Sequence, residues 1–269
     1  YAVSANTSVE QLFVAGFIPG LLGAAGLMGV AYVFARKYDF PVEEAFNIKT
    51  VKETFLDALP TFALPVIILG GIYGGIMTPT EAAAVAVIYA IPVGFLIYKG
   101  LDLKTFLFAG KESATAVGAI MLMILFSMIL SQMFVIEAVP QAIVESIFAL
   151  TDNKVVLLIL VNILLFLVGM VVNDVTAIIL VAPLLLPLME AIGISPIQFA
   201  AIMGVNTAMG GVTPPYASIL YLGARVGKVK VTKVIRPALL LIVTGYLPVV
   251  FLTAFWTDLS MYLPNLFGY

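Results

Sequence analysis

Two short stretches of the sequence hold groups that could bind a small cation. They are VVNDVTA, residues 171–177, and GVNTAMGGVTPPYAS, residues 204–218. Their carboxylate, amide, hydroxyl and carbonyl oxygens are hard ligands, which suit an alkali cation better than a transition metal. The candidate cation ligands are Asn173, Asp174, Thr176, Thr207, Gly210 and Thr213. Asn206 and Pro214 are candidates for contact with a bound substrate.

The composition indicates that these residues lie in a membrane protein. Of 269 residues, 62% are hydrophobic and 10% are charged, and the mean hydropathy is +1.16. A soluble domain carries about 25% charged residues, and several apolar runs here approach the ~18 residues that cross a bilayer. We therefore expect an all-α polytopic membrane protein. The absence of Cys excludes disulfides and thiolate metal sites, and the absence of His removes the commonest general base. A net charge of −2 does not favour nucleic-acid binding.

The carboxylate of Asp174 lies between two of these apolar runs, where a charge costs about 3 kcal/mol or more. Basic residues gather in 36–57, 99–111 and 225–236, which assigns those connections to the cytoplasm. Residues 155–189 then begin and end outside. The run 175–189 has 15 residues, which is short for a full crossing. The pattern predicts a re-entrant hairpin with its tip at Asn173–Asp174, buried in protein or facing water.

The span 198–223 contains Gly210-Gly211 and Pro214-Pro215, which predict a break near 210–215. Secondary transporters use such breaks at the midplane, where free carbonyls coordinate Na⁺ and half-helix N-termini face anionic groups. Two plainer interpretations stay open. The Gly and Pro pairs could only kink the helix, and Asp174 could only cap a helix that starts near Val175.

The sequence TPTE, residues 78–81, predicts a capping box that opens a helix over 81–98. Thr78 would be the N-cap and Glu81 the reciprocal partner, and a coupling role for Glu81 is the alternative. Ser127, Ser131 and Gln132 lie in the span 113–136, and we expect them to bond across helices rather than to face a site.

Three segments resemble the large membrane subunit (DctM-like) of TRAP transporters, the tripartite ATP-independent periplasmic family. They are GGIYGGIMTPTEAAAVAVIYA (70–90), YAVSANTSVEQLFVAGFIPGLLGA (1–24) and NTAMGGVTPPYASILYLGARV (206–226). The resemblance implies an elevator-type transporter with two inverted repeats, each holding a re-entrant hairpin and a broken helix. It also implies Na⁺-driven uptake of an organic acid, such as sialic acid or a dicarboxylate, across the bacterial inner membrane. The implied partners are a periplasmic substrate-binding protein and a small four-helix membrane subunit.

Against that family pattern, the chain matches the last span of repeat one and all of repeat two. We expect the first hairpin and first break to precede Tyr1. The residues carried over to the second Na⁺ site are the six cation ligands named above. The expected division is 1–35 for the last span of repeat one, 36–57 for an interfacial amphipathic connector, 58–112 for scaffold helices, 113–236 for transport-domain elements, and 237–269 for the final span and tail.

Other functions stay open at this point. A stand-alone elevator-type Na⁺/dicarboxylate symporter or an ion antiporter is the alternative within transport, and it would need no periplasmic binding protein. A membrane scaffold that transports nothing is a further alternative. An intramembrane hydrolase would need a second catalytic Asp, or a Ser with a base. Asp174 is the only Asp deep in an apolar stretch and there is no His, so we do not expect an enzyme.

Overall fold

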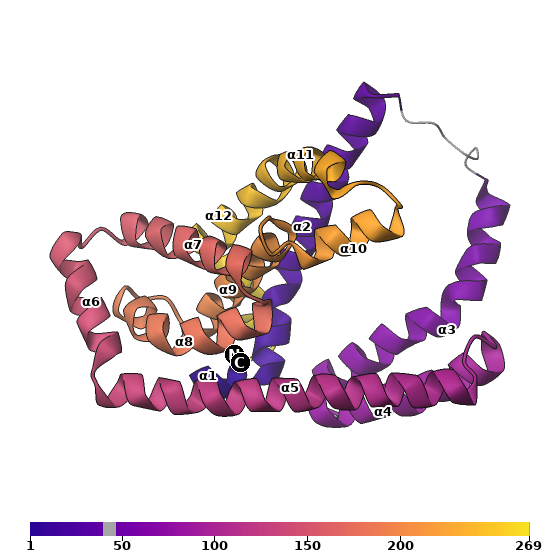
Figure 1. Ribbon diagram of the computed structural model, residues 1–269, viewed down its shortest axis with the longest axis horizontal. Coiled ribbons are helices and arrows are strands. Elements are labelled where there is room, and N and C mark those ends of the chain that lie inside the picture. Colours follow the sequence, from indigo (N-terminus) through magenta and orange to yellow (C-terminus); the bar gives the residue numbers. More distant parts are fainter. Residues whose placement is uncertain (40–46, 269) are drawn as a thin grey trace. The chain divides into compact units, whose positions relative to one another are not determined.

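The computed structural model describes residues 1–39 and 47–268, and every regular element within them is a helix (Figure 1). Seven helices in this part of the chain are long and apolar enough to cross a membrane, which confirms the all-α polytopic class. In chain order the helices are α1 (Ala2–Ala5), α2 (Val9–Lys37), α3 (Ile48–Tyr73), α4 (Pro79–Pro92), α5 (Leu103–Ile136), α6 (Val139–Leu150), α7 (Lys154–Val171), α8 (Asp174–Ala191), α9 (Pro196–Val212), α10 (Ser218–Val226), α11 (Val231–Leu241), α12 (Leu247–Phe255) and α13 (Asp258–Leu266), with π-helical segments at Val93–Ile97 and Ile242–Tyr246.

The chain forms two compact units. The first contains Tyr1–Asp39 and Met123–Tyr269, and the second contains Phe40–Leu122. Within the second unit, α3 and α4 pack against each other, and the Tyr89 hydroxyl donates to the Pro60 carbonyl at 2.8 Å. The predicted interfacial connector lies partly outside the described residues, because 40–46 are not among them. Residues 48–57 form the first turns of α3.

The capping box predicted at the start of α4 is confirmed. The backbone N–H of Thr78 donates to Glu81 Oε2 at 2.7 Å, and the N–H of Glu81 donates to Thr78 Oγ1 at 3.3 Å. Two backbone donors that the first helical turn would leave unpaired are thereby satisfied. The sequence TPTE therefore has a structural role at this helix end.

In the first unit, side chains also fix where α7 and α9 begin. The Asn153 Oδ1 accepts from the backbone N–H of Val155 at 2.9 Å at the start of α7. The Ser195 Oγ accepts from the N–H of Gln198 at 3.1 Å at the start of α9. Such caps contribute about 1 kcal/mol each and define sharp helix starts.

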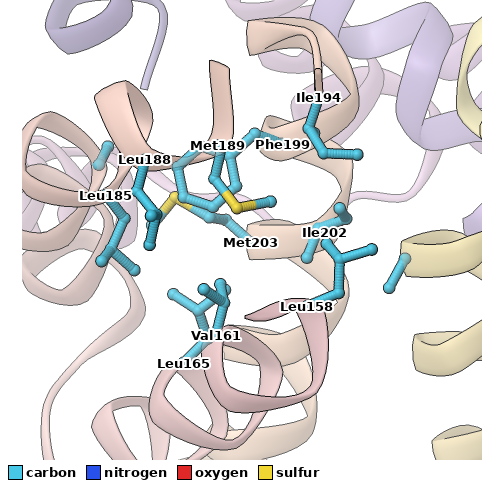
Figure 2. Packing of buried hydrophobic residues seen from close by; sticks show 12 residues of the cluster. Leu158, Val161, Leu165, Leu185, Leu188, Met189, Ile194, Phe199, Ile202 and Met203 are labelled. Carbon is cyan, nitrogen blue, oxygen red and sulfur yellow. The ribbon is translucent and has the colours of Figure 1, made fainter. Parts of the chain in front are cut away.

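One core joins α7, α8 and α9 (Figure 2). Its buried side chains are Leu158, Val161 and Leu165 from α7, Leu185, Leu188 and Met189 from α8, and Phe199, Ile202 and Met203 from α9. Because lipid tails are as apolar as these side chains, close packing rather than water exclusion stabilises such contacts inside a bilayer. The two legs of the hairpin and the first part of the broken span are thereby packed together.

Glycines allow α2 to approach the π-helical segment Ile242–Tyr246 closely. A methyl group at Gly245 would lie 3.0 Å from the carbonyl oxygen of Gly26, and one at Gly23 would lie 2.9 Å from the Tyr246 ring. Small residues at such crossings are typical of membrane helix interfaces. The long helix α2 therefore belongs to the same packed unit as the final span.

Candidate cation and substrate site

The hairpin tip is short, because α7 ends at Val171 and α8 begins at Asp174. The side chain of Asn173 caps α8, since its Oδ1 accepts from the backbone N–H of Val175 at 2.9 Å. The interpretation in which Asp174 supplies this cap is therefore wrong. Asp174 is the first residue of α8, and its carboxylate remains available for another role.

The span 198–223 is broken rather than kinked. Helix α9 ends at Val212 and α10 begins at Ser218, which leaves five residues, 213–217, between them. The break lies slightly later than the predicted 210–215, because Gly210 and Gly211 are still helical. The prolines end the helix, since they lack the N–H that the next turn would need.

The tip and the break lie next to each other. A methyl group at Gly211 would stand 3.0 Å from Asp174 Oδ1, so only a glycine leaves the carboxylate this close to α9. The Asn173 Nδ2 donates to the Tyr216 hydroxyl at 3.2 Å, and the Tyr216 N–H donates to the Met170 carbonyl at 2.9 Å. Hydrogen bonds thus join the two interruptions, although they are about 40 residues apart in the sequence.

A glycine crossing holds α7 against α9 just behind this contact. A methyl group at Gly210 would lie 2.6 Å from the Cα of Gly169, and one at Gly169 would lie 3.2 Å from the Cα of Thr207. No side chain fits between the two backbones here. Gly210, a predicted ligand, therefore also has a packing role.

Thr207 of α9 and Thr213, which directly follows α9, are both buried, and each donates its hydroxyl proton to a carbonyl of α9. Thr207 Oγ1 donates to the Met203 carbonyl at 2.9 Å, and Thr213 Oγ1 donates to the Met209 carbonyl at 2.8 Å. A hydroxyl that donates its proton keeps two lone pairs. Both oxygens therefore keep acceptor capacity for a cation.

The Asp174 carboxylate is half-buried and lacks a basic partner. Among the described residues the only ion pair within 4.0 Å is Lys49–Glu53. The N-terminus of α8 places a partial positive charge beside the Asp174 carboxylate, but a carboxylate in a poorly solvated site is stabilised further by a cation. No group of three His, Cys, Asp or Glu is found in the described part of the chain. A site made of one carboxylate with hydroxyls and carbonyls would fit a monovalent cation better than a divalent one.

The amide of Asn206 turns toward α7 instead of toward the tip. Its Nδ2 donates to Asn162 Oδ1 and to the Ile202 carbonyl, both at 2.8 Å, and its Oδ1 is buried without a partner. Asn162 in turn donates to the Leu158 carbonyl at 2.6 Å. The pair links the two helices through a polar contact in an otherwise apolar interface.

The remaining two predicted residues are Thr176 and Pro214. Thr176 is half-buried in the first turn of α8, two residues after Asp174, and Pro214 is half-buried within the break. Neither side chain takes part in the hydrogen bonds that join the tip to the break.

A cavity of about 510 Å³ begins next to the tip, within the first unit. Its polar lining includes Ser4 of α1 and Ser127, Ser131 and Gln132 of α5, and its apolar wall includes Val175 of α8. The three α5 residues therefore line a cavity, rather than bonding across helices as the sequence suggested. The volume is within the range of small-molecule sites.

Sequence reasoning missed several residues of this arrangement. Gly169, Gly211 and Tyr216 form close contacts across helices, and Asn162 pairs with Asn206. Asn162 gave a usable signal, because it is the only polar residue within VVLLILVNILLFLVGM. The glycines and Tyr216 gave no signal in the sequence, because their contacts depend on which helices pack together.

Comparison with known proteins gives the family. Residues 1–257 match the family described as tripartite ATP-independent periplasmic transporter, DctM component. The chain is 35% identical to the isethionate TRAP transporter permease protein DctMQ of Oleidesulfovibrio alaskensis, over 93% of this chain and 41% of that protein. It is 35% identical to the sialic acid TRAP transporter large permease protein SiaM of Vibrio cholerae, over 100% of this chain and 63% of that protein.

The chain is also 34% identical to the C4-dicarboxylate TRAP transporter large permease protein DctM of Pseudomonas aeruginosa, over 100% of this chain and 62% of that protein. It thus spans between 41% and 63% of the length of these three relatives. The family match extends over nearly the whole chain and includes all three segments that carry the sequence resemblance. This multi-pass membrane chain therefore belongs to the DctM-component family of the tripartite ATP-independent periplasmic transporters.

Proposed function

We propose that this chain is part of the large permease subunit of a Na⁺-coupled TRAP transporter that imports an organic acid across the bacterial inner membrane. The observation that carries the proposal is the contact between Asp174, at the hairpin tip, and Gly211, at the end of the first half of the broken span. A carboxylate without a basic partner meets a helix end at which the carbonyls of Met209 and Gly210 each accept from Thr213 and keep a second lone pair. Such a pairing favours a small cation.

The cation ligands in this proposal are Asp174, the hydroxyls of Thr207 and Thr213, and carbonyl oxygens near Gly210, with Asn173 and Thr176 beside them. Asn173 also positions the site, because it both caps α8 and donates to Tyr216. A bound Na⁺ would neutralise Asp174 and so remove its repulsion of an anion in the cavity that starts at Val175.

The substrate in this proposal occupies the cavity lined by Ser127, Ser131 and Gln132. Hydroxyl and amide groups of this kind donate to carboxylate or sulfonate oxygens and to sugar hydroxyls. The named relatives support an anionic substrate, since their names give isethionate, sialic acid and C4-dicarboxylates. Pro214 and Asn206 were the sequence candidates for this contact. The Asn206 side chain pairs with Asn162 of α7 instead of facing the cavity.

Movement by an elevator mechanism is part of the same proposal. The shared core of α7, α8 and α9 supports it, because tip and break would travel together as one body. The separate compact unit that contains α3 and α4 supports a static scaffold. A periplasmic binding protein would deliver the substrate, and a small membrane subunit would complete the complex.

The test is the Na⁺ dependence of uptake in proteoliposomes that contain the permease bearing this chain, its small subunit and its binding protein. Asp174→Asn keeps the shape of the side chain and removes the charge. We expect the half-saturating Na⁺ concentration to rise at least tenfold, which corresponds to about 1.4 kcal/mol. Omission of the binding protein should abolish uptake in all variants.

The matched control is Asp152→Asn, which removes an exposed carboxylate before α7. It should leave the Na⁺ dependence unchanged. An unchanged Na⁺ dependence in Asp174→Asn would show that the carboxylate only stabilises the N-terminus of α8 and does not bind Na⁺. Uptake without any binding protein would instead favour the stand-alone symporter.

A further inference from the structure

An apolar groove of about 480 Å³ lies in the first unit, apart from the hairpin tip. It is formed mainly by the end of α9 together with α10 and α11. Its lining includes Met209, Val212, Gly223, Ala224, Val234 and Ala238. We call it the α10–α11 groove. Nothing in the cation and substrate proposal makes use of it.

The two helices that form the groove and the loop between them carry a strong positive charge. Arg225, Lys228, Lys230, Lys233 and Arg236 follow one another within twelve residues, and all five are exposed. No Asp or Glu occurs between Glu190 and Asp258. Within the part of the chain that the structure describes, none of these five cations forms an ion pair.

The charges and the groove lie on adjoining faces of the same helices. On α11, Val234 and Ala238 are one turn apart and line the groove, whereas Lys233 and Arg236 are three residues apart and share another face. On α10, buried Ala224 lines the groove, and exposed Arg225 follows it directly.

We propose that the α10–α11 groove binds one anionic phospholipid, with an acyl chain in the groove and the phosphate on the basic residues around it. The occupant follows from charge complementarity. Five unpaired cations select an anion, the apolar lining selects a hydrocarbon chain, and a phospholipid joins both in one molecule. The cytoplasmic leaflet is anionic and attracts basic segments, and Arg and Lys bind phosphate oxygens directly.

The loop charges alone would follow from the positive-inside rule and would need no particular lipid. The groove is the second, independent observation, because positive charge for orientation does not require a cavity beside it. The proposal therefore predicts selective binding at one site and not a general attraction to charged membranes.

The test measures lipid binding to the detergent-purified permease that bears this chain by native mass spectrometry. The probes are dioleoyl phosphatidylglycerol and dioleoyl phosphatidylcholine, which share acyl chains and differ in net charge. We expect one phosphatidylglycerol per chain, bound at least tenfold more tightly than phosphatidylcholine. Glycerol phosphate, which has the anionic group without the chains, should not compete.

Two variants separate the two features. Gly223→Phe should fill the groove, since Gly223 lines it and a methyl group there meets no atom within 4 Å. It should abolish binding of both lipids. Lys228→Gln with Lys230→Gln should weaken phosphatidylglycerol binding about 25-fold, at about fivefold per charge, and leave phosphatidylcholine unchanged.

The matched controls are Gly118→Phe and Lys104→Gln with Lys111→Gln, all exposed positions of α5 that do not line the groove. They should leave binding unchanged. Equal binding of both lipids, or full phosphatidylglycerol binding in Gly223→Phe, would overturn the proposal. So would a wild-type dimer that Gly223→Phe converts to a monomer without lipid release, because a second copy would then occupy the groove.

Discussion

At the residue scale, the absence of a side chain at Gly211 determines how near the Asp174 carboxylate can come to the end of α9. The same logic applies to Gly210 and Gly169, where two backbones meet without a side chain between them. The carboxylate itself has no basic neighbour among the described residues. A small displacement here acts directly on the proposed cation ligands, because ligand geometry tolerates only small errors.

The first prediction concerns Gly211→Ala. The added methyl group would stand 3.0 Å from Asp174 Oδ1, so the carboxylate must move by a few tenths of an ångström. We expect the half-saturating Na⁺ concentration for uptake to rise about fivefold, since a misplacement of 1 Å can reduce activity about 100-fold. Uptake in proteoliposomes at graded Na⁺ measures the effect.

Gly204→Ala is the matched control, because Gly204 lies on the same helix and a methyl group there meets no atom within 4 Å. It should leave the Na⁺ dependence unchanged. Equal behaviour of the two variants would mean that the Gly211 contact does not influence cation binding.

At the element scale, α9 is the central helix of the first unit. It packs against α7 and α8 through the shared core, and the Asn162–Asn206 pair adds a polar contact to its interface with α7. An intact amide pair in an apolar interface stabilises the fold only modestly. A buried amide that loses its partner destabilises the fold by more than the pair contributes.

The second prediction is therefore a double-mutant cycle. Asn162→Leu or Asn206→Leu alone should lower the free energy of unfolding by about 1–2 kcal/mol, because each leaves a buried amide without its partner. The double variant should be less destabilised than the sum of the two. The midpoints of unfolding in detergent, measured for all four proteins, provide the comparison.

A control cycle combines Asn162→Leu with Thr244→Val. The Thr244 hydroxyl donates to the Leu240 carbonyl one turn earlier. The effect of Thr244→Val should add to that of Asn162→Leu. Simple additivity for Asn162 and Asn206 would contradict the proposed coupling between α7 and α9.

Much of this architecture was predictable from local sequence. The capping box at Thr78, the tip at Asn173–Asp174 and a break near the Pro pair all follow from residue types that act on their own neighbours. The predicted break was early because Gly-Gly tolerates a helix, whereas Pro-Pro removes two backbone donors.

The contacts between helices were not predictable. The approach of Gly211 to Asp174 and of Gly169 to Gly210 depends on which helices pack together and at which depth. Hydrophobic periodicity carries little of that information in a membrane protein, because lipid-facing and protein-facing residues are both apolar. Asn206 illustrates the limit, since its position in the sequence suggested the site and its side chain meets Asn162.

At the scale of the whole molecule, the distribution of basic residues predicts which connections face the cytoplasm. The loop between α10 and α11 carries Lys228 and Lys230, and the connection before α7 carries Asp152 and a single basic residue, Lys154. By the positive-inside rule, the first lies inside and the second outside.

The third prediction tests this orientation with a membrane-impermeant maleimide on intact cells. This chain contains no Cys, so in a permease whose cysteines elsewhere are replaced, single-cysteine variants report one position each. Asp152→Cys should be labelled directly, and Lys228→Cys only after the cells are permeabilised. The Cys-free parent gives the background labelling. The reverse labelling pattern would contradict the proposed topology.

Helix α5 has 34 residues, none of them buried, and at 1.5 Å per residue it is about 51 Å long, against a hydrocarbon layer of about 30 Å. Its charged residues Lys104, Lys111 and Glu112 all lie near its start, and the uncharged remainder, 113–136, spans about 36 Å. The charged start therefore extends into the headgroups, while the rest is long enough to lean within the bilayer. The thickness of the host membrane will consequently influence how steeply this helix stands, and proteoliposomes made from longer- or shorter-chain lipids are the natural place to measure it.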